Sequence, residues 1–194
     1  MTLAIIRYNA GNVKSLGFAL ERLGVNAVLT DDHESIRSAD RVIFPGVGEA
    51  RSTMEYLRKS GLDKVITHLK QPVLGICLGM QLLCRFSEEN NTDCLNVFDV
   101  EVKKFPDHQG TKVPQVGWNT LQSTGIWPGD IFNNQHVYFV HSYYAPVNPW
   151  TSAISEHGVP FSAAMQKENF YALQFHPEKS ADTGIKILKT FLSL

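Results

Sequence analysis

The stretch Pro72-Val-Leu-Gly-Ile-Cys77-Leu-Gly-Met-Gln81 places a cysteine between two glycines, directly after an apolar run. Residues 73–76 have the composition of a parallel strand that is buried on both faces. A helix is expected next, from the near-helical spacing of Leu78, Leu82, Leu83 and Phe86. The cysteine therefore lies at a predicted strand-to-helix turn, where Gly75 and Gly79 permit a sharp bend and a close approach of neighbouring backbone.

Two interpretations of Cys77 follow from this position. The dipole and free N–H groups of a helix N-terminus favour a thiolate, which makes the residue a candidate nucleophile. A free cysteine beside a strand is also commonly a small buried hydrophobe. The local pattern does not decide between them, so the nucleophile hypothesis requires partners elsewhere in the chain.

Composition narrows the class of protein. With 194 residues and 43% hydrophobic content, residues 1–194 are expected to form a single domain. Eighteen basic and nineteen acidic side chains give a net charge of −1, without a basic block that would indicate nucleic acid or a membrane surface. Small molecules or proteins are the expected ligands.

The three cysteines indicate a reduced, cytoplasmic protein. They make an odd number and lack metal-ligand spacing, so no metal site is expected. No cofactor is expected either. The first residues are too short and wrongly ordered for a signal peptide, and no apolar run approaches the roughly 20 residues of a membrane helix.

The order of apolar segments predicts an α/β fold. Strands are expected at 3–8, 26–29, 41–44 and 73–76, with helices at 13–23, 50–59 and 183–192. Asn12 and Gly24 are expected to bound the first helix, Gly61 to stop the second, and Asp182 to lie near the start of the last. That last helix should bury Ile187, Leu188, Phe191 and Leu192.

Later apolar runs at 97–103, 137–140, 151–155, 161–166 and 170–175 are expected to extend the same sheet, partly antiparallel. The prediction is an open, mostly parallel, twisted sheet in three layers, with helices on both faces and an antiparallel extension.

Ligands of open α/β sheets bind beyond the carboxyl ends of the strands, so the turns there are compared next. Besides Cys77, two turns follow predicted strands: Pro-Gly-Val-Gly at 45–48 and His-Pro-Glu-Lys at 176–179. A catalytic thiol needs a base, a group that orients the base, and donors for the oxyanion. These two turns contain residues for all three tasks.

Seven histidines are candidates for the base. Four are expected to be solvated: His33, His68, His108 and His157. His136 precedes a strand and has no evident partner, whereas His141 and His176 both end apolar runs. Only His176 has a carboxylate two residues later, with a proline between them, so it is the preferred base. The other interpretation of Glu178 is a solvated loop carboxylate paired with Lys179.

The motif G-I-C-L-G-M-Q around Cys77 and the motif F-H-P-E-K-S at 175–180 together resemble those of class I glutamine amidotransferases with a Cys-His-Glu triad. Further segments narrow the resemblance to glutaminase subunits of imidazole glycerol phosphate synthase, an enzyme of histidine biosynthesis. These segments are P-G-V-G at 45–48, V-P-Q-V-G-W-N at 113–119, Y-F-V-H-S-Y at 138–143 and P-V-N-P-W at 146–150. The resemblance spans essentially the whole chain.

The resemblance implies a set of roles. Cys77 would attack L-glutamine, His176 would transfer the proton, and Glu178 would orient the imidazole. The N–H groups of Leu78 and, after a peptide flip, Val47 would bind the oxyanion. The residues implied to hold the substrate are Gly48, Gln81, Ser142 and Tyr143.

The resemblance also implies a partner. A cyclase subunit of (β/α)8 fold would form a heterodimer with this chain, receive its ammonia and make imidazole glycerol phosphate and AICAR. Trp118, Tyr138 and Lys179 match interface positions. Without the resemblance, they read as half-buried core, an alternating strand residue and a solvated charge.

Two departures from the family pattern are visible. Arg7 stands where the family often has an acidic residue, in I-D-Y-G-x-G-N, and Gln115 stands where histidine is common. We expect both to alter interface or surface electrostatics rather than chemistry.

Alternatives remain open at this point. They are a paralogous glutaminase serving surface-sugar or vitamin B6 synthesis, a cysteine peptidase or other cysteine hydrolase on the same scaffold, and a non-catalytic binding subunit.

Overall fold

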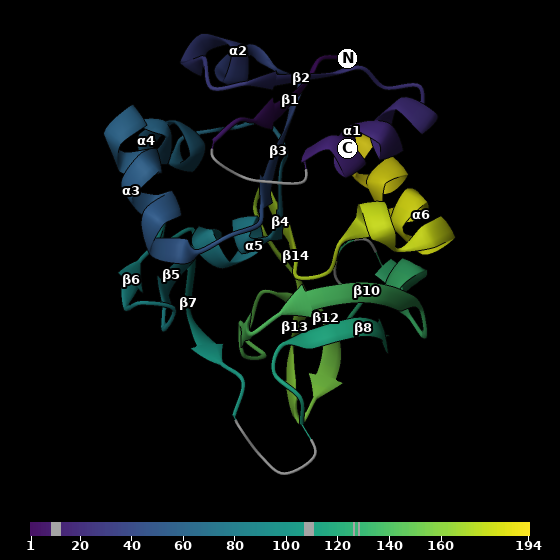
Figure 1. Ribbon diagram of the computed structural model, residues 1–194. Coiled ribbons are helices and arrows are strands. Elements are labelled where there is room, and N and C mark those ends of the chain that lie inside the picture. The colour runs from purple at the N-terminus through teal and green to yellow at the C-terminus, as the bar shows by residue number, and fades with distance from the viewer. Residues whose placement is uncertain (9–12, 107–110, 126, 128) are drawn as a thin grey trace.

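A computed structural model describes residues 1–8, 13–106, 111–125, 127 and 129–194 of the chain. Within this part, the largest sheet has eight strands in the order β2-β1-β3-β4-β14-β13-β12-β9 (Figure 1). Neighbours from β2 to β14 are parallel, whereas β13, β12 and β9 continue the sheet in antiparallel pairs. The predicted α/β fold, mostly parallel with an antiparallel extension, is confirmed.

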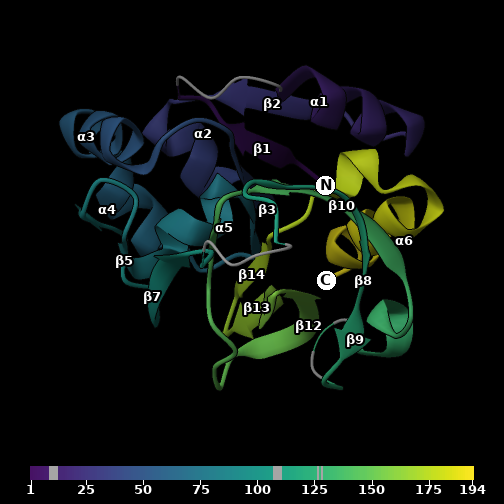
Figure 2. The same cartoon turned by 60° about the horizontal axis from the view of Figure 1, so that its bottom comes forward.

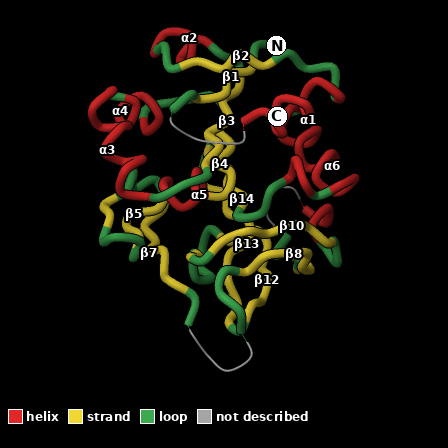
Figure 3. The backbone as a smooth tube through the Cα atoms, in the orientation of Figure 1, coloured by secondary structure: helices red, strands yellow, loops and turns green. Residues whose placement is uncertain are grey.

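The parallel strands are β1 (Leu3–Ile6), β2 (Ala27–Thr30), β3 (Arg41–Gly46), β4 (Val73–Cys77) and β14 (Phe170–Leu173). The antiparallel ones are β13 (Val159–Lys167), β12 (Thr151–His157) and β9 (Gln122–Ser123). Figure 3 shows that helices flank the parallel part of this sheet.

Helices cover the two faces of the parallel strands separately, as Figures 1 and 2 agree. One face carries α1 (Val13–Arg22) and α6 (Ala181–Leu192). The other carries α2 (His33–Ser38), α3 (Ala50–Ser60), α4 (Leu62–Thr67) and α5 (Leu78–Leu83). Of the helices in the described ranges, none has the length and apolar character that crossing a membrane requires.

Alternating residues of the central strands supply the two cores. In β1, Ala4 and Ile6 pack into the core beneath α2 to α5, whereas Leu3 and Ile5 pack into the core beneath α1 and α6. Each is at most 2% exposed. Burial of an aliphatic side chain of Leu or Ile size contributes about 1.5–3 kcal/mol, which explains why these strands are apolar on both faces.

Two smaller sheets correct the prediction that all later runs join the main sheet. Strand β10 (His136–His141) pairs antiparallel with β8 (Gln115–Thr120), a strand that the sequence did not predict. Strand β7 (Phe98–Lys104) belongs to a sheet with β11 (Tyr143–Tyr144), β5 (Cys84–Ser87) and β6 (Thr92–Asp93). Short 3-10 turns η1 (Gly129–Phe132) and η2 (Pro177–Lys179) complete the elements.

The helix predictions are partly wrong. Helix α5 ends at Leu83, and Phe86 lies in β5 opposite Glu101 of β7, because pairing between these strands replaces the next helical turn. Gly61 does end α3, with φ of 73° and its N–H bonded to the Arg58 carbonyl, but the unpredicted α4 follows directly. Helix α6 starts two residues early, and its Leu192 is only half-buried. Asn12, the expected cap of α1, lies outside the described residues.

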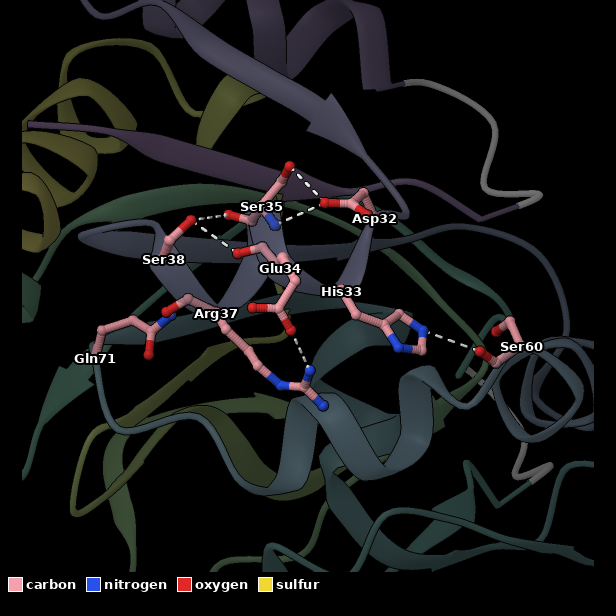
Figure 4. A network of polar contacts seen from close by, with 8 residues as sticks. All are labelled: Asp32, His33, Glu34, Ser35, Arg37, Ser38, Ser60 and Gln71. Atoms are coloured by element: carbon pink, nitrogen blue, oxygen red, sulfur yellow. Dashed lines mark hydrogen bonds and ion pairs between the residues drawn. The ribbon is translucent and has the colours of Figure 1, made fainter.

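Helix α2 was also not predicted, because hydrogen bonds rather than an apolar stripe define it (Figure 4). Asp32 caps its first turn by accepting from the backbone N–H of Ser35 at 2.8 Å. Arg37 pairs with Glu34 at 2.7 Å, and Ile36 is the helix's buried residue. One buried side chain in six gives no readable period.

Candidate active site

Cys77 occupies a strained corner between β4 and α5. Its φ of 54° and ψ of −110° lie where non-glycine residues are rarely found. Such a conformation costs about 1–3 kcal/mol and persists only where the surrounding packing enforces it. A strained strand-to-helix turn that presents a side chain at the sheet edge is the geometry of a nucleophile elbow.

Close packing around three glycines enforces the backbone conformation of this corner. A β-carbon on Gly79 would lie 2.0 Å from the carbonyl oxygen of Phe44, and one on Gly46 would lie 2.5 Å from the backbone nitrogen of Gly79. One on Gly75 would lie 2.7 Å from the Leu83 side chain. The predicted close approach at Gly75 and Gly79 is confirmed, and it clamps α5 against the end of β3.

His176 and Glu178 reach the same edge from the neighbouring strand. Strand β14 runs parallel to β4, with Leu173 opposite Ile76, and η2 follows it. Nδ1 of His176 lies 2.8 Å from Oε1 of Glu178, and both side chains are only 5% exposed. Among the described residues, Oε2 of Glu178 has no hydrogen-bond partner. The interpretation of Glu178 as a solvated carboxylate paired with Lys179 is therefore wrong.

The surroundings of His176 favour its protonated form. Burial alone would lower its pKa, but hydrogen bonds to Cys77 and Glu178, together with attraction to both groups, raise the pKa above its usual value. An imidazolium held between a carboxylate and a sulfur stabilises the thiolate. This is the electrostatic arrangement that a cysteine nucleophile requires.

A pocket of about 360 Å³ opens over these residues. Its lining contains Val47, Gly48, Cys77, Leu78, Gln81, Glu89, Pro114, Val140, His141, Ser142, Tyr143, His176 and Lys179. The structure thus gathers the predicted nucleophile, base, oxyanion and substrate residues in one place. Trp118 and Tyr138 are not in this lining, although Lys179 is.

Glu89 lines the pocket and was missed from the sequence. Its Oε2 accepts from the backbone N–H of Ala50 at 2.8 Å, and burial raises the pKa of its carboxyl group. The signal was hidden because the helix was expected to continue to Phe86. The turn after β5 instead brings Glu89 back to the start of α3.

His141 lines the pocket too, but its ring is fully engaged. Nδ1 lies 2.7 Å from the carbonyl oxygen of Tyr143, and the terminal amide of Gln115 lies 2.9 Å from Nε2. Burial lowers the pKa of His141 to about 4. Gln115 is itself only 5% exposed, so the expectation that it alters interface or surface electrostatics is wrong. It holds a buried histidine instead.

The remaining described histidines lie outside the pocket. His33 contacts the Ser60 carbonyl, as Figure 4 shows, and His157 contacts the Lys112 carbonyl; both are half-buried rather than solvated. His136 contacts Thr120 across the β8–β10 pair, and His68 is exposed as expected. His108 lies outside the described residues. His176 remains the predicted base.

The aromatic positions implied at an interface gather beside the pocket. The rings of Trp118 and Tyr138 meet edge to face at 6.0 Å between centroids, and Nζ of Lys179 lies 5.8 Å from the Tyr138 ring centroid. Trp118 is 54% exposed, so its interpretation as half-buried core is wrong.

A three-layer α/β sheet with a cysteine at a strained strand-to-helix turn and a buried His-Glu pair fits the class of triad enzymes that the sequence motifs predicted. The family model of class I glutamine amidotransferases matches residues 5–193. The chain belongs to this family and is an enzyme of this class.

Individual relatives within this family are similar to the chain over its full length. The chain is 56% identical to the imidazole glycerol phosphate synthase subunit HisH of Bacteroides fragilis strain YCH46, over the full length of both. It is 45% identical to the protein of that name from Idiomarina loihiensis, covering 100% of this chain and 98% of the relative.

Solved structures support the fold. One described as a glutamine amidotransferase matches with a TM-score of 0.77 at 18% identity, covering 100% of this chain and 98% of that one. A glutamine amidotransferase from Thermotoga maritima matches with a TM-score of 0.66 at 17% identity, covering 100% of this chain and 81% of that one.

Proposed function

We propose that the chain is the glutaminase subunit of a cytoplasmic imidazole glycerol phosphate synthase. It hydrolyses L-glutamine to glutamate and ammonia as a single domain. A partner cyclase subunit of (β/α)8 fold receives the ammonia in a heterodimer and makes imidazole glycerol phosphate and AICAR for histidine synthesis. The observation that carries the proposal is the buried Cys77, His176 and Glu178 arrangement in a chain closely similar to HisH subunits.

The proposed chemistry uses the triad in two stages. The Cys77 sulfur attacks the side-chain carboxamide carbon of glutamine, and His176, having taken the thiol proton, gives it to the departing ammonia. Water, deprotonated by His176, then cleaves the glutamyl thioester and regenerates the thiol. Glu178 keeps the imidazole oriented by its 2.8 Å contact with Nδ1.

Two backbone N–H groups are proposed to bind the oxyanion. Leu78 is the first residue of α5, where N–H groups have no partner within the helix. Val47 follows the end of β3, and Gly48 beside it has a φ of 122°, with no atom within 4 Å of the place that a β-carbon would occupy. This open, glycine-flanked segment permits the peptide at Val47 to rotate toward the oxyanion.

The pocket supplies complementary groups for the amino-acid end of glutamine. Gln81 and Gly48 lie on its wall, together with Ser142 and Tyr143. We add Glu89, whose half-buried carboxylate fits the α-ammonium group of the substrate.

The docking face for the cyclase is proposed on the β8–β10 pair. Val116 pairs with Val140, and Trp118 pairs with Tyr138, so these four side chains share one face. Val116 and Trp118 are 60% and 54% exposed, which is unusual for such large apolar groups. Val140 and Lys179 also line the catalytic pocket. A partner seated on this face would cover the pocket and keep ammonia from water.

Backbone contacts join this face to the base. The N–H of His176 donates to the Tyr138 carbonyl at 2.9 Å, and the N–H of Tyr138 donates to the Ser180 hydroxyl at 3.0 Å. That hydroxyl donates to the His176 carbonyl at 2.7 Å. A partner that displaces Tyr138 would also displace the catalytic histidine, because these hydrogen bonds join the two residues. This connection supports coupling between the two proteins.

Substitution Cys77→Ala in the complex with the cyclase tests the proposal. Glutamine-dependent synthesis of imidazole glycerol phosphate should be abolished, whereas synthesis from added ammonium should survive. The matched control is Cys94→Ala, which changes a half-buried cysteine outside the pocket and should retain both activities. Loss of both activities in Cys77→Ala, or survival of both, would contradict the assignment.

A further inference from the structure

Gln174 is a fully buried polar side chain beside the nucleophile, and the triad chemistry gives it no task. It follows β14, two residues before His176, and is 0% exposed. Its backbone N–H donates to the Ala163 carbonyl at 2.9 Å, which fixes it against β13. A buried amide needs partners for its own donors and acceptor, so its side-chain contacts are informative.

The side chain of Gln174 contacts both Gln81, which lines the pocket, and the sulfur of Cys77. Its Oε1 accepts from Nε2 of Gln81 at 3.0 Å, and its Nε2 donates toward Sγ of Cys77 at 3.9 Å. Gln81 also donates to the Tyr143 carbonyl at 2.9 Å. Both N–H groups of the Gln81 amide are thereby engaged. Only its carbonyl oxygen is left for a ligand in the pocket.

The Cys77 sulfur forms different hydrogen bonds in its two protonation states. A neutral thiol can donate, and the Val140 carbonyl lies 3.8 Å from Sγ in position to accept. A thiolate can only accept, and the same carbonyl then faces it with like partial charge. Gln174 offers the thiolate an N–H donor in a buried place, where charge-assisted hydrogen bonds are strong.

We propose that Gln174 joins substrate binding to nucleophile activation, by donating to the Cys77 thiolate through Nε2 while its Oε1 fixes the orientation of Gln81. The proposal rests on Cys77 being the nucleophile of the proposed glutaminase. It makes Gln174 a second stabiliser of the thiolate besides His176. A ligand that donates a hydrogen bond to the Gln81 carbonyl oxygen polarises the side-chain amides of Gln81 and Gln174. This polarisation strengthens the hydrogen bond from Gln174 to the Cys77 sulfur.

The test measures the pH midpoint of Cys77 alkylation by iodoacetamide in the full-length chain, followed on the Cys77 peptide by mass spectrometry. Gln174→Met removes the donor at similar length, and Gln174→Glu preserves the bond from Gln81 but replaces the donor with a carboxylate. We expect the midpoint to rise by about one pH unit in Gln174→Met, which is about a tenfold slower reaction at pH values below both midpoints, and by more in Gln174→Glu. Gln166→Met, on the neighbouring strand, is the control and should leave the midpoint unchanged.

Other titrating groups are untouched in these variants. The titratable groups that face the sulfur or share its pocket are His176, Tyr8, His141, Tyr143, Glu89 and Lys179. A role in packing alone would lower the melting temperature without moving the midpoint. In Gln174→Met the KM for glutamine should rise as well, because Gln81 loses the acceptor that orients it.

The wild-type chain provides a measurement that does not depend on a variant folding. The side-chain amide resonances of Gln174 in a ¹⁵N-labelled sample should shift with pH at the same midpoint as the alkylation of Cys77. An unchanged midpoint in both variants, or a Gln174 amide that does not sense the Cys77 titration, would overturn the proposal. A wild-type chain whose Cys77 neither alkylates nor supports glutamine hydrolysis would instead refute the proposed function.

Discussion

The elbow after β4 and the turn after β3 lie side by side at one edge of the sheet and both line the pocket, but they are held very differently. At the elbow, Cys77 is forced into a strained conformation and Gly79 has no room for a β-carbon. In the turn after β3, the residues at the start of the turn are fixed, because the Tyr8 hydroxyl donates to the Pro45 carbonyl and Gly46 pairs with Cys77. Its tip at Gly48 is exposed and has open space around it.

The difference separates two requirements of catalysis. A nucleophile must be held in place, so its strain is balanced by packing from three glycines and a neighbouring strand. The proposed oxyanion donor at Val47 needs freedom to rotate, and the positive φ and open surroundings of Gly48 permit that rotation. One edge of one sheet thus carries both a rigid and an adjustable half of the proposed site.

The largest expected effect is at the rigid half. Gly79→Ala would place a β-carbon 2.0 Å from the Phe44 carbonyl oxygen, which neither backbone can accommodate. We expect a loss of more than about 3 kcal/mol in the free energy of unfolding, or no folded protein. Gly48→Ala should fold and lose only about 1–3 kcal/mol, through its positive φ. Urea unfolding of the two variants measures the contrast. Equal stabilities would refute it.

Next in size is the orientation of the base. Glu178→Gln replaces the carboxylate that contacts Nδ1 of His176 and removes the charge that favours the imidazolium. We expect kcat for glutamine in the complex to fall by about 10²- to 10⁴-fold, with binding of the cyclase unchanged. The control is Glu156→Gln, at an exposed position. A kcat within about threefold of wild type would show that Glu178 does not orient the base.

A buried histidine makes the packed side of the pocket sensitive to acid. Burial lowers the pKa of His141 from 6.5 to about 4, so between these pH values the unfolded chain binds a proton that the folded chain does not. Its contribution to stability is complete above about pH 6.5 and is lost as the pH falls toward 4. The loss is at most about 3 kcal/mol.

Comparison of wild type with His141→Asn isolates this contribution. Urea unfolding at several pH values between 7 and 4 should give a shallower loss of stability in the variant. The titrating carboxylates are common to both proteins and cancel. Parallel curves would mean that His141 titrates normally in the folded chain.

Some of the site could be read from sequence because its signals are local. The apolar run, the two glycines and the cysteine all fall within ten residues and agree in predicting the elbow. His176 and Glu178 likewise come from one short segment after a strand. Their meeting with Cys77 follows from the parallel order of β4 and β14, which two buried apolar runs make inferable.

Other features depend on contacts between distant segments. Glu89 reaches the pocket through the return of β5, and Gln174 reaches Cys77 through the pairing of β14 with β4. Neither residue has a local pattern that distinguishes it. Phe86 continues the helical spacing of the apolar residues after Cys77, but it lies in strand β5 because it pairs opposite Glu101. Helix α2 depends on its Asp32 cap rather than on apolar period. Such tertiary and capping effects override periodicity.

A smaller effect is expected where the docking face meets the base. Ser180→Ala removes the hydroxyl that joins the Tyr138 N–H to the His176 carbonyl. The loss of a buried hydrogen bond of about 1 kcal/mol should reduce the partner's stimulation of glutamine hydrolysis by roughly fivefold. Affinity for the cyclase and the basal rate should change little. Ser193→Ala, past the far end of α6, is the control; unchanged stimulation in Ser180→Ala would remove this contact from the coupling.

The smallest effect is expected at Arg7, whose charge departs from the family pattern. Arg7 lies 2.6 Å from Asp31, and the two side chains are 57% and 38% exposed. Exposed pairs of this kind contribute little, because water and salt screen them. Arg7→Ala should therefore leave the melting temperature, glutaminase activity and cyclase affinity essentially unchanged. An affinity that falls more than about tenfold at low salt and recovers at high salt would instead place Arg7 against the partner. The docking surface would then extend from the β8–β10 face to the end of β1.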